Sequence, residues 1–191
     1  MKLIFTLIIL CAPLCIPLAA QETNLHAAGT IQLNGGLGFA NPVYGGTAGV
    51  DVRAGKAVFS VDLDASRIEK TVGGQGYRVT ARQTARVYLR PQFFVQAGAI
   101  EQHYAVKQFS KSSVQPLVGF GFASIDGKQI WQFNYRHDIN SENKQRIFEG
   151  TVTLYLARHL FVRGAIGLDH FRSGRVSQGG AASSVGFGFH F

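Results

Sequence analysis

The segment Arg136-His-Asp-Ile-Asn-Ser141 carries the most obvious residues for hydrolysis, a histidine that could act as a base and a serine that could act as a nucleophile. The base must share a face with the nucleophile, and in an extended strand residues i and i+2 do so. The residue two places after His137 is Ile139, whereas Ser141 follows in a predicted loop. We therefore expect no catalytic site, and hydrolysis by His137 and Ser141 is kept as a lesser alternative.

Other chemistry is weakly represented. Two glycine-rich stretches, residues 35–38 and 119–121, look like phosphate loops, but no helix is predicted after either. The histidines show no metal-ligand spacing; they are His26, His103, His137, His159, His170 and His190. We expect no cofactor and no metal.

Charged residues that alternate with apolar ones form a second candidate site. By strand parity, six carboxylates and six arginines point to the polar faces of their strands: Asp51, Asp62, Asp64, Asp138, Glu149 and Asp169, and Arg53, Arg78, Arg82, Arg86, Arg136 and Arg163. Enclosed charges lose hydration and need partners, and the guanidinium fork can serve several carboxylates. We expect a network inside a narrow lumen; for Asp51, Asp138 and Asp169, near strand ends, simple contact with water is the alternative.

Ten strand-length segments separated by turn signals would position these charges. They run over residues 29–40, 46–53, 56–66, 77–90, 92–103, 114–125, 128–138, 147–157, 160–171 and 182–191. Their connections alternate between tight turns at 54–55, 90–91, 126–127 and 158–159 and longer polar loops at 41–45, 67–76, 104–113, 139–146 and 172–181. Eight strands are the alternative, because the first two segments are rich in glycine and Pro116 weakens the sixth.

Polar and apolar residues alternate within these segments. In residues 77–90, Tyr77 and Leu89 share one face, and Arg78 and Arg82 the other. Nearly every segment is apolar on one side with aromatic residues near its ends, which is typical of a lipid-facing wall. Open strand edges cannot exist in lipid, so the sheet must close. The pattern predicts an all-β protein, a closed antiparallel transmembrane β-barrel with short periplasmic turns and longer extracellular loops.

The C-terminus carries a specific motif. The last segment, Ser184-Val-Gly-Phe-Gly-Phe-His-Phe191, ends in an alternating aromatic strand. The spacing of Ser184, Gly186, Phe189 and Phe191 resembles the C-terminal assembly signal of bacterial outer-membrane β-barrels, and the chain is similar to small OmpA-like and OmpX-like barrel proteins. The resemblance implies a monomer in the outer membrane with a periplasmic C-terminus, and the barrel assembly machinery as a partner during biogenesis.

For such a barrel we expect a structural or surface-interaction role, with the lumen plugged by the arginine–carboxylate network. A narrow porin-like channel for small solutes is the first alternative. A lipid-active enzyme similar to lipid A deacylases, using His137 and Ser141, is the second.

The N-terminus predicts export. Residues 1–20 combine a basic start, an apolar stretch from Leu3 to Leu10 and a small-residue end, which predicts a cleaved signal peptide and leaves residues 21–191 as a single barrel domain. Both cysteines lie in that peptide, so no disulfide is expected.

The basic residues suggest a partner for the outer rim. The formal net charge is +8, but the basic residues form no continuous patch, so no nucleic-acid partner is expected. The basic residues of the longer loops predict contact with outer-membrane lipid and lipopolysaccharide phosphates. They are Arg67, Lys70, Lys107, Lys111, Lys144, Arg146, Arg172 and Arg175.

Overall fold

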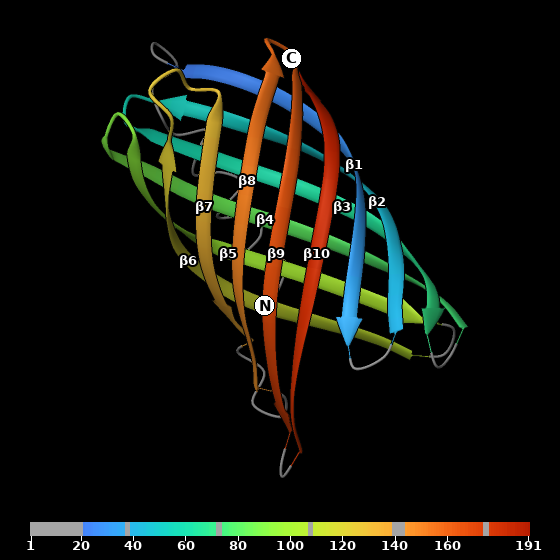
Figure 1. Cartoon of the computed structure of the whole chain (residues 1–191). Coiled ribbons are helices and arrows are strands. Elements are labelled where there is room, and N and C mark those ends of the chain that lie inside the picture. The colour runs from blue at the N-terminus through green and yellow to red at the C-terminus, as the bar shows by residue number, and fades with distance from the viewer. Residues whose placement is uncertain (1–20, 37–38, 72–73, 107–108, 139–143, 174–175) are drawn as a thin grey trace.

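The computed structural model describes residues 21–36, 39–71, 74–106, 109–138, 144–173 and 176–191, and these form one closed antiparallel barrel of ten tilted strands (Figure 1). The strands are β1 (Gln21–Gly36), β2 (Phe39–Ala54), β3 (Ala57–Thr71), β4 (Gly74–Arg90), β5 (Phe93–Val106), β6 (Phe109–Ala123), β7 (Gln129–His137), β8 (Lys144–Ala157), β9 (Leu160–Ser173) and β10 (Val176–His190). Ten strands are confirmed over eight. The predicted signal peptide, residues 1–20, lies outside the described residues, and within the described part of the chain no helix could span a membrane.

The four tight turns fall where the sequence predicts them. The connections are residues 55–56, 91–92, 124–128 and 158–159. Gly55 and Gly127 adopt φ values of 59° and 69°, the left-handed region that glycine enters without a steric cost. In the turn at 124–128, Asp126 accepts hydrogen bonds from the Ser124 hydroxyl and the Lys128 backbone N–H. These two hydrogen bonds hold the pKa of Asp126 below its ordinary value, and the bond from Ser124 has the larger effect.

The prediction of longer loops at the other end is wrong over its described residues. Residues 41–45 lie inside β2, and most of residues 67–76, 104–113 and 172–181 continue the flanking strands, as do residues 144–146 of the remaining expected loop. Apart from β7, with 9 residues, the strands have 14 to 17 residues, more than the roughly 9–11 that span a bilayer. Outside the membrane both faces of a hairpin meet water, so polar and apolar residues no longer alternate there. The backbone still pairs, and the strands therefore continue beyond the predicted ends.

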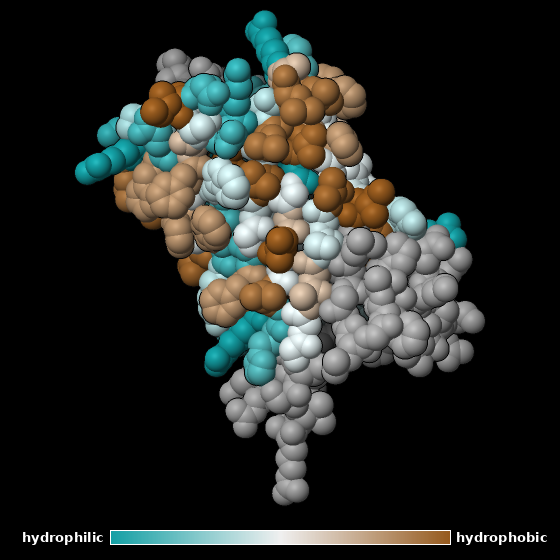
Figure 2. All heavy atoms as spheres, viewed as in Figure 1, coloured by the Kyte–Doolittle hydropathy of each residue, from teal (hydrophilic) through white to brown (hydrophobic). Residues whose placement is uncertain are grey.

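The outward face of the barrel is apolar. More than half of the side chain is exposed for Leu63 on β3, Tyr77 on β4, Phe148 on β8, Ile166 on β9 and Phe187 on β10. On the face seen in Figure 2, residues of intermediate to high hydropathy cover most of the middle, and hydrophilic side chains are most prominent toward the ends. A wall of this kind fits lipid, and it confirms the predicted parity.

The C-terminal strand closes the barrel. β10 pairs with β1 from Gly35↔Ala181 to His26↔His190. One step further, the backbone N–H of Phe191 donates to the Leu25 carbonyl at 2.7 Å. β1 begins at Gln21, which pairs with Ala54 of β2, so the predicted bounds of 29–40 for the first strand and 46–53 for the second are wrong. The missed start of β1, residues 21–28, contains no glycine, whereas the missed start of β2 includes Gly45.

Candidate functional site in the lumen

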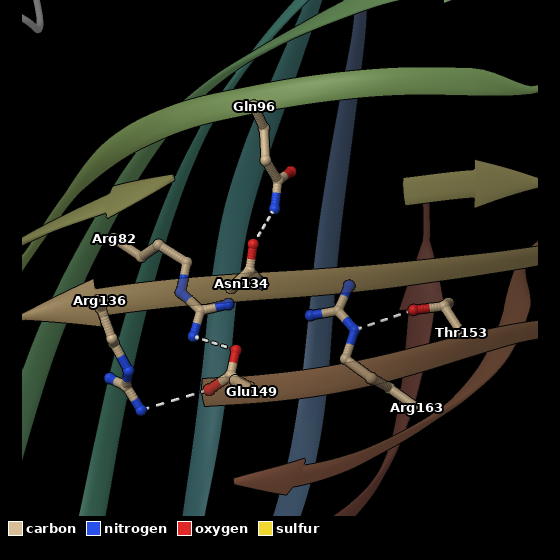
Figure 3. A network of polar contacts seen from close by, with 7 residues as sticks. All are labelled: Arg82, Gln96, Asn134, Arg136, Glu149, Thr153 and Arg163. Atoms are coloured by element: carbon tan, nitrogen blue, oxygen red, sulfur yellow. Dashed lines mark hydrogen bonds and ion pairs between the residues drawn. The ribbon is translucent and has the colours of Figure 1, made fainter. Parts of the chain in front are cut away.

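Glu149 on β8 binds two arginines. Its Oε1 lies 3.2 Å from Arg82 Nη2 on β4, and its Oε2 lies 3.3 Å from Arg136 Nη2 on β7. Figure 3 shows the two guanidinium groups converging on the carboxylate. Because β4 and β8 are not neighbours in the sheet, the Arg82–Glu149 contact crosses the lumen. The Glu149 side chain is 12% exposed, so this bridge is largely shielded from water.

Asp62 on β3 pairs with His26 on β1, with 2.6 Å between Asp62 Oδ1 and His26 Nε2. The strand between them, β2, has Gly49 as the register partner of both residues. A Cβ at Gly49 would lie 2.6 Å from His26 Nε2, so the absent side chain lets the pair meet. Sequence reasoning missed His26 because the first strand was expected to begin at residue 29; extending the alternation backwards would have found it.

Asp64, Arg78 and Asp169 lie nearer to the long hairpins. Asp64 accepts a hydrogen bond from Ser66 Oγ at 2.6 Å, and Arg78 Nη2 donates to the same hydroxyl at 3.3 Å. Asp169 Oδ2 accepts from Gln145 Nε2 at 2.6 Å. These predicted network residues thus combine charged groups with neutral polar partners.

Arg86 and Arg163 lie against aromatic rings, whereas the sequence predicted that they would pair with carboxylates. The Arg86 guanidinium carbon lies 4.7 Å from the centre of the Phe94 ring, and that of Arg163 lies 5.4 Å from the centre of the Phe161 ring. Arg163 Nε also donates to Thr153 Oγ1 at 3.2 Å. Among the described residues neither arginine forms an ion pair with a carboxylate. Aromatic faces attract guanidinium groups, which explains this placement.

Phe94 and Phe161 are buried on the inward face of the barrel near the tight turns. Each is the second residue of its strand, and their exposed fractions are 0% and 2%. The register partner of Phe94 is Gly121, and that of Phe161 is Gly188. A Cβ at either glycine would enter the space of the facing ring. The glycines therefore form recesses that accept the rings.

Two tyrosines lie next to these phenylalanine rings. The Tyr88 ring centre lies 5.2 Å from that of Phe94, and the Tyr155 ring centre lies 6.0 Å from that of Phe161. Sequence reasoning did not identify the layer, although the adjacent pairs Phe93-Phe94 and Leu160-Phe161 required one residue of each to face inward. We call Tyr88, Phe94, Tyr155 and Phe161 the aromatic layer.

A cavity of about 580 Å³ occupies the lumen on the other side of this layer, toward the long hairpins. Its lining includes eight of the twelve predicted network residues: Asp62, Asp64, Arg78, Arg82, Arg136, Glu149, Arg163 and Asp169. Asp51, Arg53, Arg86 and Asp138 are not part of the lining. The charges thus line a space large enough for water or a small solute instead of filling the lumen.

The described residues show no contact that would support hydrolysis by His137 and Ser141. His137 is the last residue of β7, and Ser141 lies outside the described residues. Within the described ranges no cluster of side chains suits a metal ion.

Comparison with known proteins supports the fold. No family model matches the chain, and no curated protein matches its sequence. Among solved structures, the chain is similar to the N-terminal β-barrel domain of OprF from Pseudomonas aeruginosa, with 12% identity, a TM-score of 0.44, and coverage of 90% of this chain and 99% of that one. An outer-membrane channel from Pseudomonas putida F1 has 6% identity, a TM-score of 0.50, and coverage of 92% and 97%. The NanC porin has 12% identity, a TM-score of 0.46, and coverage of 86% and 98%.

At these identities the likeness concerns the fold alone. The chain therefore shares a closed antiparallel β-barrel fold with these outer-membrane proteins, as the strand pattern and the terminal motif of the sequence predicted.

Proposed function

We propose that this chain is an outer-membrane barrel with a structural or surface-interaction role, and that its lumen is closed to solute passage. The apolar outward wall and the strand lengths support insertion in lipid. We place the tight turns and the C-terminus on the periplasmic side of the membrane, and the long hairpins on the side of the cell surface.

The aromatic layer carries the proposal of a closed lumen. Phe94 and Phe161 sit in recesses made by Gly121 and Gly188, so their rings cannot swing aside without losing close packing. Beyond this layer, the contact of Glu149 with two arginines ties opposite walls together. A barrel of this size has an interior that side chains can fill.

Two measurements test this proposal. The protein should fractionate with the outer membrane and show a heat-modifiable shift on gels. In planar bilayers, the purified folded protein should give no steady conductance of porin size. Recovery in the soluble fraction would contradict the membrane location, whereas steady porin-like steps would contradict the closed lumen.

A narrow channel for small solutes is the second candidate, and the cavity of about 580 Å³ favours it. Its lining pairs acids with arginines, which suits polar solutes. Proteoliposomes would swell in small sugars or amino acids if the cavity continued through the aromatic layer, and they would stay stable if it ended there.

We also propose that the outer rim contacts lipopolysaccharide. Arg67 and Arg146 are exposed near the long hairpins, and their charge suits lipid phosphates. Lipopolysaccharide binding should weaken with salt and fall when both residues are changed to glutamate.

A further inference from the structure

A polar cluster lies on the outward face of β5 and β6, away from the lumen. His103 on β5 and Ser112 on β6 are register partners, and His103 Nδ1 lies 2.9 Å from Ser112 Oγ. Both residues are exposed. Glu101 precedes His103 by two residues on β5, so it shares the same outward face. The sequence pattern did not single out this cluster, because His103 and Ser112 meet only through strand pairing.

The surroundings of the cluster are those of a lipid-facing wall. Val79 is the partner of His103 on β4, and it is 50% exposed. Val114 is the partner of Glu101 on β6, and it is 38% exposed. His103 is the eleventh residue of β5 counted from the tight turn, about the length that crosses the hydrocarbon core. The cluster therefore lies where the acyl chains of the outer leaflet meet their headgroups.

Polar side chains at this border have a cost in lipid unless they interact or function there. A serine hydroxyl hydrogen-bonded to an imidazole is the arrangement that activates a serine nucleophile. Glu101 shares this face without an ion pair to His103 among the described residues, so its negative charge favours the protonated imidazole only at a distance. The ester bonds of membrane lipids lie at this depth, so the cluster combines a nucleophile, a base and access to a substrate.

We propose that Ser112, His103 and Glu101 form an acyl-ester hydrolysis site that acts on ester-linked acyl chains of the outer leaflet. Ser112 Oγ attacks the ester carbonyl carbon while its proton passes to His103. The bond to the alcohol oxygen then breaks, and His103 returns the proton to that oxygen. Water, deprotonated by His103, then attacks the carbonyl carbon of the acyl-Ser112 ester. The bond between that carbon and Ser112 Oγ breaks, His103 returns the proton to Oγ, and a carboxylic acid leaves. Glu101 does not touch the reacting atoms; its charge favours the protonated form of the imidazole.

This site is independent of the lumen. It faces lipid, whereas the aromatic layer and the cavity face inward, so a closed or an open lumen leaves the hydrolysis unaffected.

The test uses the whole folded barrel in mixed micelles, with fatty-acid release measured from phosphatidylethanolamine in one arm and from lipid A in the other. S112A and H103N should each lower release from the preferred substrate by roughly a hundredfold or more. S110A is the matched control, because Ser110 lies two residues along β6 on the same face. It should retain wild-type release, and a heat-modifiable gel shift checks that each variant is folded.

Two further readouts separate catalysis from structure. A fluorophosphonate should label Ser112 covalently in the wild type, and H103N should lose most of this labelling. E101Q should keep the labelling site but shift the pH–rate profile of release, as expected when the imidazole loses a carboxylate neighbour. Release from neither substrate by folded wild-type protein, or equal release by S112A, overturns the proposal. A wild-type dimer that S112A or E101Q dissociates, without any hydrolysis, also overturns it and assigns the cluster to self-association.

Discussion

Replacing Glu149 with glutamine should destabilise the barrel strongly, because the carboxylate neutralises Arg82 and Arg136 together. The side chains of these arginines are 29% and 17% exposed, so their charges are only partly screened once the carboxylate is gone. Removing one member of a buried ion pair costs roughly 3–5 kcal/mol, and water in the adjacent cavity reduces this toward the lower end. We expect E149Q to lower the free energy of unfolding by about 3 kcal/mol.

Urea unfolding from lipid vesicles measures this effect. Trp131 is the only tryptophan of the chain and is 46% exposed on the outward face, so its fluorescence reports loss of lipid contact. E101Q is the matched control, since Glu101 forms no ion pair among the described residues and should change stability little.

A double-mutant cycle between Arg82 and Glu149 isolates their contact. The double variant R82Q/E149Q should lose less free energy of unfolding than the sum of the two single variants. It lacks both charges of this pair, so neither is left in the lumen without the other. If the two changes are additive, or if E149Q unfolds like E101Q, the inferred role of the cross-lumen contact is refuted.

Three further predictions concern the strand ends and one turn. G188A should lower the free energy of unfolding by about 1–3 kcal/mol, because its Cβ would crowd Phe161 and lie 2.6 Å from the Ala27 carbonyl, whereas G180A, with open space around it, should be neutral in the same urea titration. Deleting Phe191 should lower the amount of protein in the outer membrane of cells while refolding in detergent proceeds; equal amounts in cells would contradict its role in assembly. The folded-state pKa of Asp126 is lowered, so its contribution to stability is present above the ordinary carboxyl pKa and is lost as pH falls through the folded value. D126N should remove that pH-dependent part, and an identical acid dependence in wild type and D126N would contradict it.

The sequence predicted the features of this barrel that depend on local chemistry. Glycine at residues 55 and 127 marked two tight turns because only glycine enters left-handed backbone geometry freely. Alternation separated inward from outward residues wherever one face meets lipid, and the parity assignments for Arg82 and Glu149 followed from that.

The unpredicted features depend on pairing between distant strands. Arg82 and Glu149 meet only because the sheet closes, and no pattern within either strand selects one partner for the other. The long hairpins were missed because alternation disappears where both faces meet water. The recesses at Gly121 and Gly188 depend on register, which places each glycine opposite an inward phenylalanine.

The most direct test of a lumen closed by the aromatic layer is planar-bilayer recording of the wild type beside the double variant F94A/F161A. Removing both rings leaves empty space at the level of the aromatic layer, where both native side chains are almost fully buried. The wild type should show no steady conductance, and the folded double variant should show discrete, reproducible steps. Steady porin-size conductance from the wild type, or a folded double variant as silent as the wild type, would contradict closure by these rings.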